Sequence, residues 1–263
     1  MSYDDLVKAT SIPPQPVHTT APAEAAGSRR CRNWFRRNPV AAFLIALAFA
    51  LVTAPFEEMV RYGDLVEAMR FTVVLVAPLL ALGDRRRALI WGVVLGAPAL
   101  AGKWAAHGWP ELVPAWVFLV PGLLFVGFVT QHLLRFIVRA PRVDSEVLCA
   151  GVASYVLLGL FWALAYILVE VLVPGSFNFS GTADPGQSMK GFTAMYFSFI
   201  TLCTVGYGDI APLSGPARML AMTEAMTGTL YMAVLVARLV SLYSSGKPVP
   251  ADMGTGNPGA RTA

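Results

Sequence analysis

The chain has 263 residues, of which 56% are apolar and only 14% are charged, whereas a soluble domain usually carries about 25% charged residues. A mean hydropathy of +0.59 excludes an ordinary soluble enzyme, because a chain of this length cannot bury so many apolar side chains in one core. The net charge is +4, with arginines gathered in clusters, a pattern that bears on orientation in a membrane and not on nucleic-acid binding.

Both ends of the chain are polar. Residues 1–37 contain several prolines followed by a run of arginines, and residues 245–263 are rich in glycine, proline and serine. Neither segment holds enough apolar residues for a core, so we expect a disordered basic leader and a disordered tail. The tail is far shorter than the about 50 residues of a small domain, so we expect no soluble ligand-binding domain after the last span.

Apolar runs of about membrane-spanning length recur between these tails, and about 20 residues suffice to cross a bilayer. The second run is weakened by Glu67 and Arg70, and the last is interrupted by Glu224. A signal peptide is the rival interpretation of the first run, but the long leader ahead of it argues against cleavage. The predicted spans are Asn38–Phe56, Leu65–Leu82, Ala88–Gly102, Leu112–Leu134, Val147–Val169 and Met219–Val236.

Arginine clusters indicate the orientation. They lie in the leader, after the second span at Arg85–Arg87, and after the fourth span from Arg135 to Arg142. Six spans bring all three clusters to one side, which the positive-inside rule identifies as the cytoplasm. Both termini are then cytoplasmic. Anionic lipids are possible partners of these clusters, at about 1 kcal/mol for each basic residue, although topology alone explains them.

A further apolar run, Gly191–Gly208, ends in a glycine-rich stretch that is poor helix, so we expect a re-entrant loop that enters from outside and lines a cavity. Its end, Thr201–Asp209, reads T-L-C-T-V-G-Y-G-D. A lone Gly-Tyr-Gly is usually a turn, but here a helix-like run precedes it and a span lies on each side. This nonapeptide resembles the potassium-channel signature, and about residues 145–244 resemble the pore domain of that superfamily.

The resemblance implies an all-α membrane protein with six transmembrane helices per subunit, a re-entrant pore helix and a filter loop. It divides the chain into a four-helix voltage-sensor-like domain at 38–142 and a pore domain at 143–244. The pore domain would consist of an outer helix, a pore helix, the filter and an inner helix. A bacterial inner membrane is the expected location, and the order of segments resembles that of voltage-gated-like subunits.

Potassium must shed its water at little cost, and a column of backbone carbonyl oxygens can replace that water. We therefore expect ion-binding sites at Thr204, Val205, Gly206, Tyr207 and Gly208. The two glycines, Gly206 and Gly208, supply the positive φ angles that such a column requires, and the side chains of Val205 and Tyr207 turn outward. Since one chain supplies a quarter of the ring, the working unit is a homotetramer. Potassium is the permeant ion and no cofactor is expected.

The resemblance also implies supporting residues around the filter. Asp209 and Thr201 flank it, and Tyr196 stands where relatives often have a tryptophan, so we expect its hydroxyl to donate to Asp209. Glu224 is expected to brace the pore helix or the filter through a hydrogen bond; an ion site or a proton sensor is the lesser alternative. Gly228 matches the inner-helix hinge position, although close helix contact explains a glycine there equally well.

Other segments limit the function. The predicted fourth span contains no arginine, whereas a voltage sensor needs several, because each charge that crosses the field contributes about 2.3 kcal/mol per 100 mV. Gly92 and Gly96 predict close helix packing, and Arg238 is interpreted as an interfacial anchor. Three distant cysteines suggest no disulfide framework or metal site.

We therefore expect a potassium-selective channel without intrinsic steep voltage gating, and not an enzyme. A weakly selective cation channel and a non-conducting accessory subunit are the alternatives. A membrane-embedded enzyme is a remote one, because Glu224 is the one acid well inside a late span.

Overall fold

The computed structural model describes residues 39–59, 63–81, 86–109, 112–140, 144–180 and 188–244. All of them belong to one compact unit that begins at Asn38. The predicted leader, 1–37, and the predicted tail, 245–263, lie outside the described residues.

The first half of the chain forms long helices joined by short connections. They are α3 (Pro39–Thr53), which continues into the 3-10 helix η1 (Ala54–Met59), then α4 (Gly63–Ala81), α5 (Arg86–Gly108) and α6 (Trp116–Arg139). Several boundaries differ from the prediction; α6, for example, ends at Arg139 and not at Leu134. Helix α6 begins at Trp116 and not at Leu112, because residues 112–115 form a turn that includes Pro114. Helix α5 extends to Gly108, past the charge of Lys103 at which the apolar run ends.

Five helices in the described ranges are long and apolar enough to cross a membrane: Pro39–Phe56, Arg86–Gly108, Trp116–Arg139, Ser145–Leu172 and Gly215–Ser241. Helix α4, which covers the predicted second span, has 19 residues but is not among them. One charge of α4 is paired with a charge of the neighbouring helix α5. Glu67 of α4 forms an ion pair of 3.0 Å with Lys103 of α5, and the ammonium of Lys103 lies 5.1 Å from the centre of the Phe118 ring.

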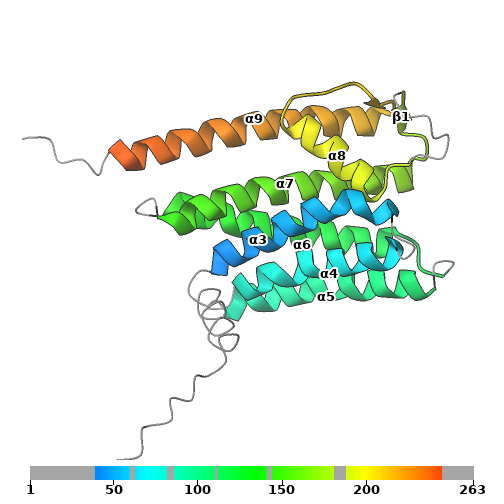
Figure 1. Ribbon diagram of the computed structural model, residues 1–263, viewed down its shortest axis with the longest axis horizontal. Coiled ribbons are helices and arrows are strands. Elements are labelled where there is room, and N and C mark those ends of the chain that lie inside the picture. Colours follow the sequence, from blue (N-terminus) through cyan, green and yellow to red (C-terminus); the bar gives the residue numbers. More distant parts are fainter. Residues whose placement is uncertain are drawn as a thin grey trace, which may run out of the picture. The chain divides into compact units, whose positions relative to one another are not determined.

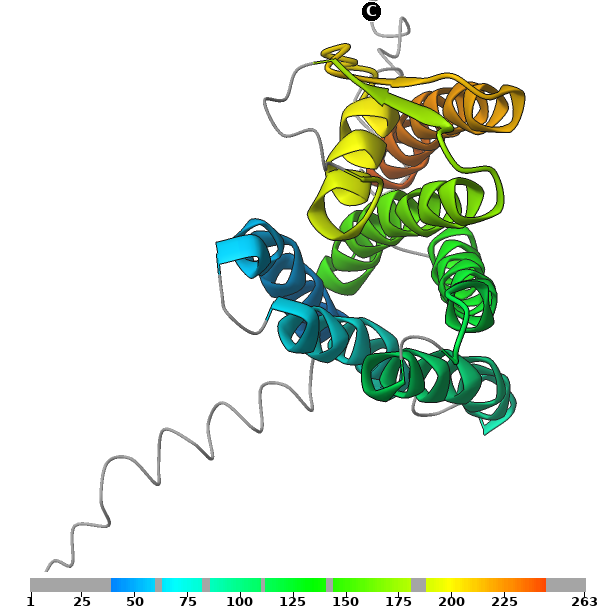
Figure 2. The same ribbon diagram turned by 90° about the vertical axis from the view of Figure 1, so that its right-hand side faces the viewer.

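Helices α3 to α6 pack together, and α3 and α6 pack against the long helix α7 (Ser145–Leu172). Seen end-on in Figure 2, α7 lies between this group and the last helices of the chain. Phe125 of α6 is central to the packing and is 1% exposed. A Cβ atom added to Gly96 of α5 would lie 3.2 Å from its ring, and one on Gly92 would lie 2.6 Å from Leu79. The predicted close helix packing at these two glycines is confirmed.

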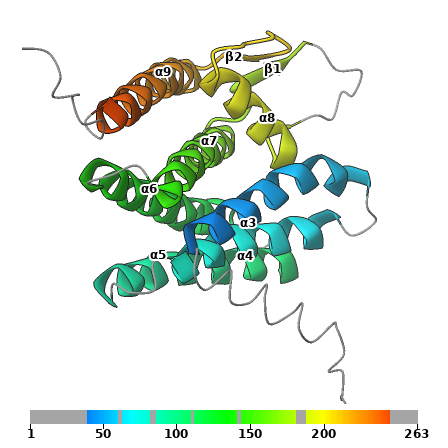
Figure 3. The same ribbon diagram turned by 60° about the vertical axis from the view of Figure 1, so that its left-hand side comes forward.

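The last third of the chain builds a second group around α7. It consists of β1 (Phe177–Phe179), α8 (Gly191–Leu202), β2 (Ile210–Pro212) and α9 (Gly215–Ser244). The short helix α8 contacts both α7 and α9 and lies near the strands at one end of the long helices (Figure 1). Strands β1 and β2 are antiparallel, with Asn178 opposite Ala211 (Figure 3). The prediction of an all-α fold omitted this small sheet, because three-residue strands are too short to show a period in sequence.

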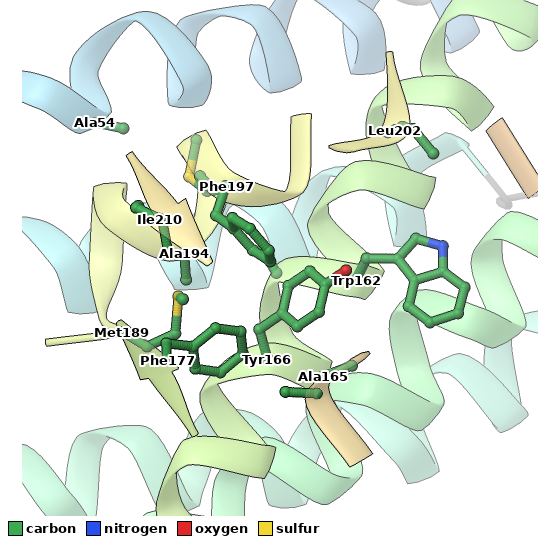
Figure 4. Packing of buried hydrophobic residues seen from close by; sticks show 13 residues of the cluster. Ala54, Trp162, Ala165, Tyr166, Phe177, Met189, Ala194, Phe197, Leu202 and Ile210 are labelled. Carbon is green, nitrogen blue, oxygen red and sulfur yellow. The ribbon is translucent and has the colours of Figure 1, made fainter. Parts of the chain in front are cut away.

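Three aromatic rings hold α8 against α7 and the sheet. The ring of Tyr166 on α7 lies edge-on to Phe177 of β1 at 5.7 Å and to Phe197 of α8 at 4.8 Å. Phe177 and Phe197 themselves meet at 5.5 Å, so the three rings form a closed set inside the buried cluster (Figure 4). Edge-to-face contacts of this kind add to the stabilisation from burial. They fix α8 against α7 and the sheet, and therefore help to place the segment that follows α8.

Candidate functional site

The segment after α8 alternates in backbone handedness. Thr204, Gly206 and Gly208 have φ angles of 57°, 53° and 82°, whereas the φ angles of Val205 and Tyr207 are not positive. Positive φ at the two glycines agrees with the prediction. Positive φ at Thr204 was not foreseen, since a β-branched residue rarely adopts it. Strain of this kind persists only where the surroundings impose it, and it is typical of functional sites.

Hydrogen bonds from residues 204–206 to α8 hold this backbone. The amide of Thr204 donates to the carbonyl oxygen of Thr201 at 2.9 Å, and the amides of Val205 and Gly206 donate to Ile200 at 2.8 Å and 3.2 Å. Three successive N–H groups therefore point at the C-terminal end of α8. Thr201 supports the filter through its backbone carbonyl. When the sign of φ alternates along the backbone, successive carbonyl groups can all point to the side opposite α8.

The side chains of Val205 and Tyr207 turn toward α8. Both line a groove of about 350 Å³ on its surface, together with Tyr196, Ile200, Cys203 and further apolar residues of α8 and α3. Cys203 lines the same groove; it is exposed, and its sulfur lies 3.3 Å from the hydroxyl of Tyr155.

Asp209 is held at the outer end of the filter. Its carboxylate accepts a hydrogen bond of 2.7 Å from the hydroxyl of Tyr196 and one of 3.0 Å from the amide of Ile210. The amide of Ser180 donates to its carbonyl oxygen at 2.8 Å. The expected bond between Tyr196 and Asp209 is therefore present.

Glu224 of α9 is fully buried, with 0% of its surface exposed. The hydroxyl of Tyr166 on α7 donates to its Oε2, and the Oγ of Ser198 on α8 lies 2.5 Å from its Oε1. Ser198 Oγ is also 2.7 Å from the carbonyl oxygen of Gly159 on α7. The carboxyl group thus bonds to α8, the helix that precedes the predicted filter, and connects three helices. Sequence reasoning missed Tyr166 and Ser198, because nothing local marks a serine or tyrosine within an apolar helix.

Gly228 lies one turn further along α9 and meets the end of α8. A Cβ atom on Gly228 would lie 2.2 Å from the carbonyl oxygen of Leu202 and 3.0 Å from its Cδ1. Helix α9 continues unbroken through this position. Of the two interpretations left open by the sequence, this geometry favours close helix contact. Glu224 and Gly228 therefore form two successive contacts with α8, at Ser198 and Leu202.

Arg238 connects the far end of α9 to α6. Its Nη2 donates to the carbonyl oxygens of Val138 and Ala140, at 3.0 Å and 3.1 Å. These carbonyls belong to the C-terminal end of α6, where intrahelical partners run out and a positive charge is favourable. The guanidinium is therefore more than an interfacial anchor, since it bonds the inner helix to the last helix of the α3–α6 group.

A metal bound by side chains would need a cluster of ligands. Within the described ranges, no group of three or more His, Cys, Asp or Glu residues is arranged to hold a metal ion. The ion-binding residues predicted from sequence lie together in one segment, and Asp209, Tyr196 and Thr201 surround it.

Residues 154–245 match the family model described as "Ion channel". This segment includes most of α7 together with α8, the filter and α9. No solved structure matches the chain.

The relatives agree with the family match. "Two pore potassium channel c" of Oryza sativa subsp. japonica is 33% identical over 34% of this chain, which spans 19% of that protein. "Voltage-gated potassium channel regulatory subunit KCNG4" of Mus musculus is 34% identical over 34% of this chain, which spans 17% of that protein. "Protein LctB" of Bacillus caldotenax is 32% identical over 44% of this chain and 87% of its own length. On these similarities and the family match, the chain belongs to the potassium channel superfamily, as a membrane channel and not an enzyme.

Proposed function

We propose that the chain forms a homotetrameric, potassium-selective channel in which the backbone of residues 204–208 surrounds the conduction path. The observation that carries the proposal is the alternating handedness of this segment, with its N–H groups bonded to the end of α8. That arrangement leaves a column of carbonyl oxygens free on the other side to replace the water of potassium. One chain supplies one wall of the column, and rotation about a four-fold axis closes it.

Each residue of the filter has a separate part in this proposal. The carbonyl groups of Thr204, Val205, Gly206 and Tyr207 bind potassium in turn, and Gly208 completes the column at the outer mouth. The outward side chains of Val205 and Tyr207 pack against the pore helix and hold the diameter. Asp209 and Tyr196 fix the outer end, while Thr201 fixes the inner end.

The membrane layout proposed here has six crossings, with α4 as the weakly apolar second one. The ion pair between Glu67 and Lys103 supports this assignment, because paired charges inside a bundle are less costly than isolated ones. Both termini then lie in the cytoplasm, and the loop of α8 and the filter enters from outside. The arginines beside α6 face the cytoplasmic leaflet of a bacterial inner membrane, where anionic lipids are available to them.

Voltage dependence is expected to be weak. Helix α6 holds the place of the sensor helix but carries its two arginines, Arg135 and Arg139, in its last five residues. Both lie at the proposed cytoplasmic interface, so neither crosses much of the membrane field. The α3–α6 group would serve as packing support for the pore domain.

A second candidate is a non-conducting accessory subunit. The similarity to a mouse protein named as a regulatory subunit favours it. Such a subunit would share the fold but require a conducting relative. Potassium selectivity separates both candidates from a weakly selective cation channel, and the reversal potential in mixed sodium and potassium measures that property.

The test is rubidium uptake into liposomes that contain only the purified chain. Gly208→Ala should abolish uptake, because the filter requires φ of 82° at this residue. Gly175→Ala is the matched control: Gly175 has φ of 78° and equally open surroundings, but it lies in the turn after α7. Uptake that survives Gly208→Ala would refute conduction through this backbone. A folded wild-type tetramer without uptake would identify the accessory subunit.

A further inference from the structure

The contacts of the buried carboxyl group of Glu224 indicate how many protons this group of residues must share. Its two oxygens meet Tyr166 Oη and Ser198 Oγ, and the same Ser198 Oγ meets the carbonyl oxygen of Gly159 at 2.7 Å. Glu224 and Ser198 are both 0% exposed. A serine hydroxyl has one proton to donate, a peptide carbonyl has none, and an ionised carboxylate has none.

An ionised Glu224 leaves this set one proton short. The single proton of Ser198 would then serve either Gly159 or the carboxylate, and the other contact would bring two oxygen atoms together with no hydrogen between them. Two bare oxygens in contact repel each other, and an unsatisfied buried polar atom is costly. The 2.5 Å distance between Ser198 Oγ and Glu224 Oε1 is a hydrogen-bond distance, so a proton belongs on that line.

A proton on Glu224 Oε1 completes the set. Glu224 then donates to Ser198, Ser198 donates to Gly159, and Tyr166 donates to Glu224 Oε2, so each contact holds one proton. We propose that Glu224 carries a proton in this structure and that this proton positions the pore helix between α7 and α9. Glu224 is a positioning residue in this proposal, which rests on the proposed channel function only for its effect on conduction.

The groups that act on Glu224 from the packed helices are consistent with a neutral acid. From α7 they are the phenols of Tyr166, which donates to it, and of Tyr155, which interacts with it electrostatically. The group from α8 that contacts Glu224 is the hydroxyl of Ser198. None of these groups carries a positive charge that would hold a carboxylate in its ionised form.

The proton is connected to the filter through α8. Ser198 lies two residues before Ile200, whose carbonyl accepts the amides of Val205 and Gly206. Removal of the proton breaks one contact of Ser198 and loosens this end of α8. Because the protonated form is the one that holds the filter, rubidium uptake should fall as the pH is raised through the titration of Glu224.

Glu224→Gln distinguishes the two protonation states. A glutamine amide donates from nitrogen and accepts at oxygen, so it reproduces the protonated acid but does not titrate. We expect Glu224→Gln to retain uptake and the melting temperature of the tetramer, and to abolish the loss of uptake at high pH. Glu224→Ala should lower the rubidium uptake and the melting temperature at every pH, because it leaves buried hydroxyl groups unpaired.

Glu170→Gln is the matched control. Glu170 accepts the amides of Gly175 and Ser176 on its two oxygens, each at 3.0 Å, so it requires an acceptor at both positions. An amide nitrogen there would face an N–H group. This variant should therefore lower the melting temperature while the pH dependence of uptake persists.

Infrared difference spectra between wild type and Glu224→Gln supply a readout that does not need conduction. A carboxylic-acid C=O band should be present in the wild type at neutral pH, absent from the variant, and lost on alkaline titration. Absence of this band from a folded wild type, or a Glu224→Gln variant as unstable as Glu224→Ala, would overturn the proposal. If the band is present but no variant takes up rubidium, the proton assignment stands and the proposed channel function fails.

Discussion

Replacement of Gly228 by alanine tests whether this glycine is a contact or a hinge. Alanine in a helix is favoured over glycine by about 1 kcal/mol, so an uncrowded or hinge position would become more stable. Here the added methyl would lie 2.2 Å from the carbonyl oxygen of Leu202. That atom belongs to the backbone of α8 and cannot rotate away, so the two helices must separate by about 1 Å to restore ordinary contact.

The magnitude follows from these two opposing effects. Overpacking of this kind costs about 1–3 kcal/mol, and a backbone neighbour suggests the upper end, so we expect a net loss of about 2 kcal/mol per subunit. Leu202 lies two residues before Thr204, so the same displacement should reach the filter and reduce rubidium uptake. The measurements are thermal unfolding of the purified tetramer and uptake by liposomes.

Gly215→Ala is the control on the same helix, because nothing lies within 4 Å of the position of its added Cβ. It should leave stability and uptake close to wild type. A Gly228→Ala variant with a raised melting temperature would refute the contact argument and restore the hinge interpretation.

Three further predictions concern the filter support, the voltage response and the far end of α9. Tyr196→Phe removes the 2.7 Å hydrogen bond to Asp209, worth about 1 kcal/mol, and should shift the reversal potential toward that of a less selective pore; an unchanged reversal potential would remove Tyr196 from the filter support. Planar-bilayer recordings should give a conductance that changes little with voltage, and a steep dependence would contradict the assignment of α6. Arg238→Gln weakens the bonds to the carbonyl groups at the end of α6 and should lower the melting temperature, with Arg238→Lys in between; equal melting temperatures would show that these bonds do not contribute.

Much of the membrane character and of the filter could be predicted from sequence, because both depend on local properties. Long apolar runs predict helices whatever their partners are, and most helix boundaries were close to those expected. Gly206 and Gly208 indicate positive φ by themselves, since the absence of a Cβ atom is a property of the residue. The hydrogen bond between Tyr196 and Asp209 could be predicted because the resemblance to potassium channels matches Tyr196 to a position where relatives often have a tryptophan.

The remaining features depend on which faces meet, and composition says little about that when a helix is apolar on all sides. Positive φ at Thr204 is imposed by the carbonyl groups at the end of α8. The contact of Gly228 with Leu202, and the set of Glu224, Ser198 and Tyr166, require three helices to be placed in register. Sequence alone therefore determined that the chain is membrane-embedded and which segment is proposed as its filter. Tertiary structure decided how the filter is held, because the groups that hold it are far apart along the chain and meet only when α7, α8 and α9 pack.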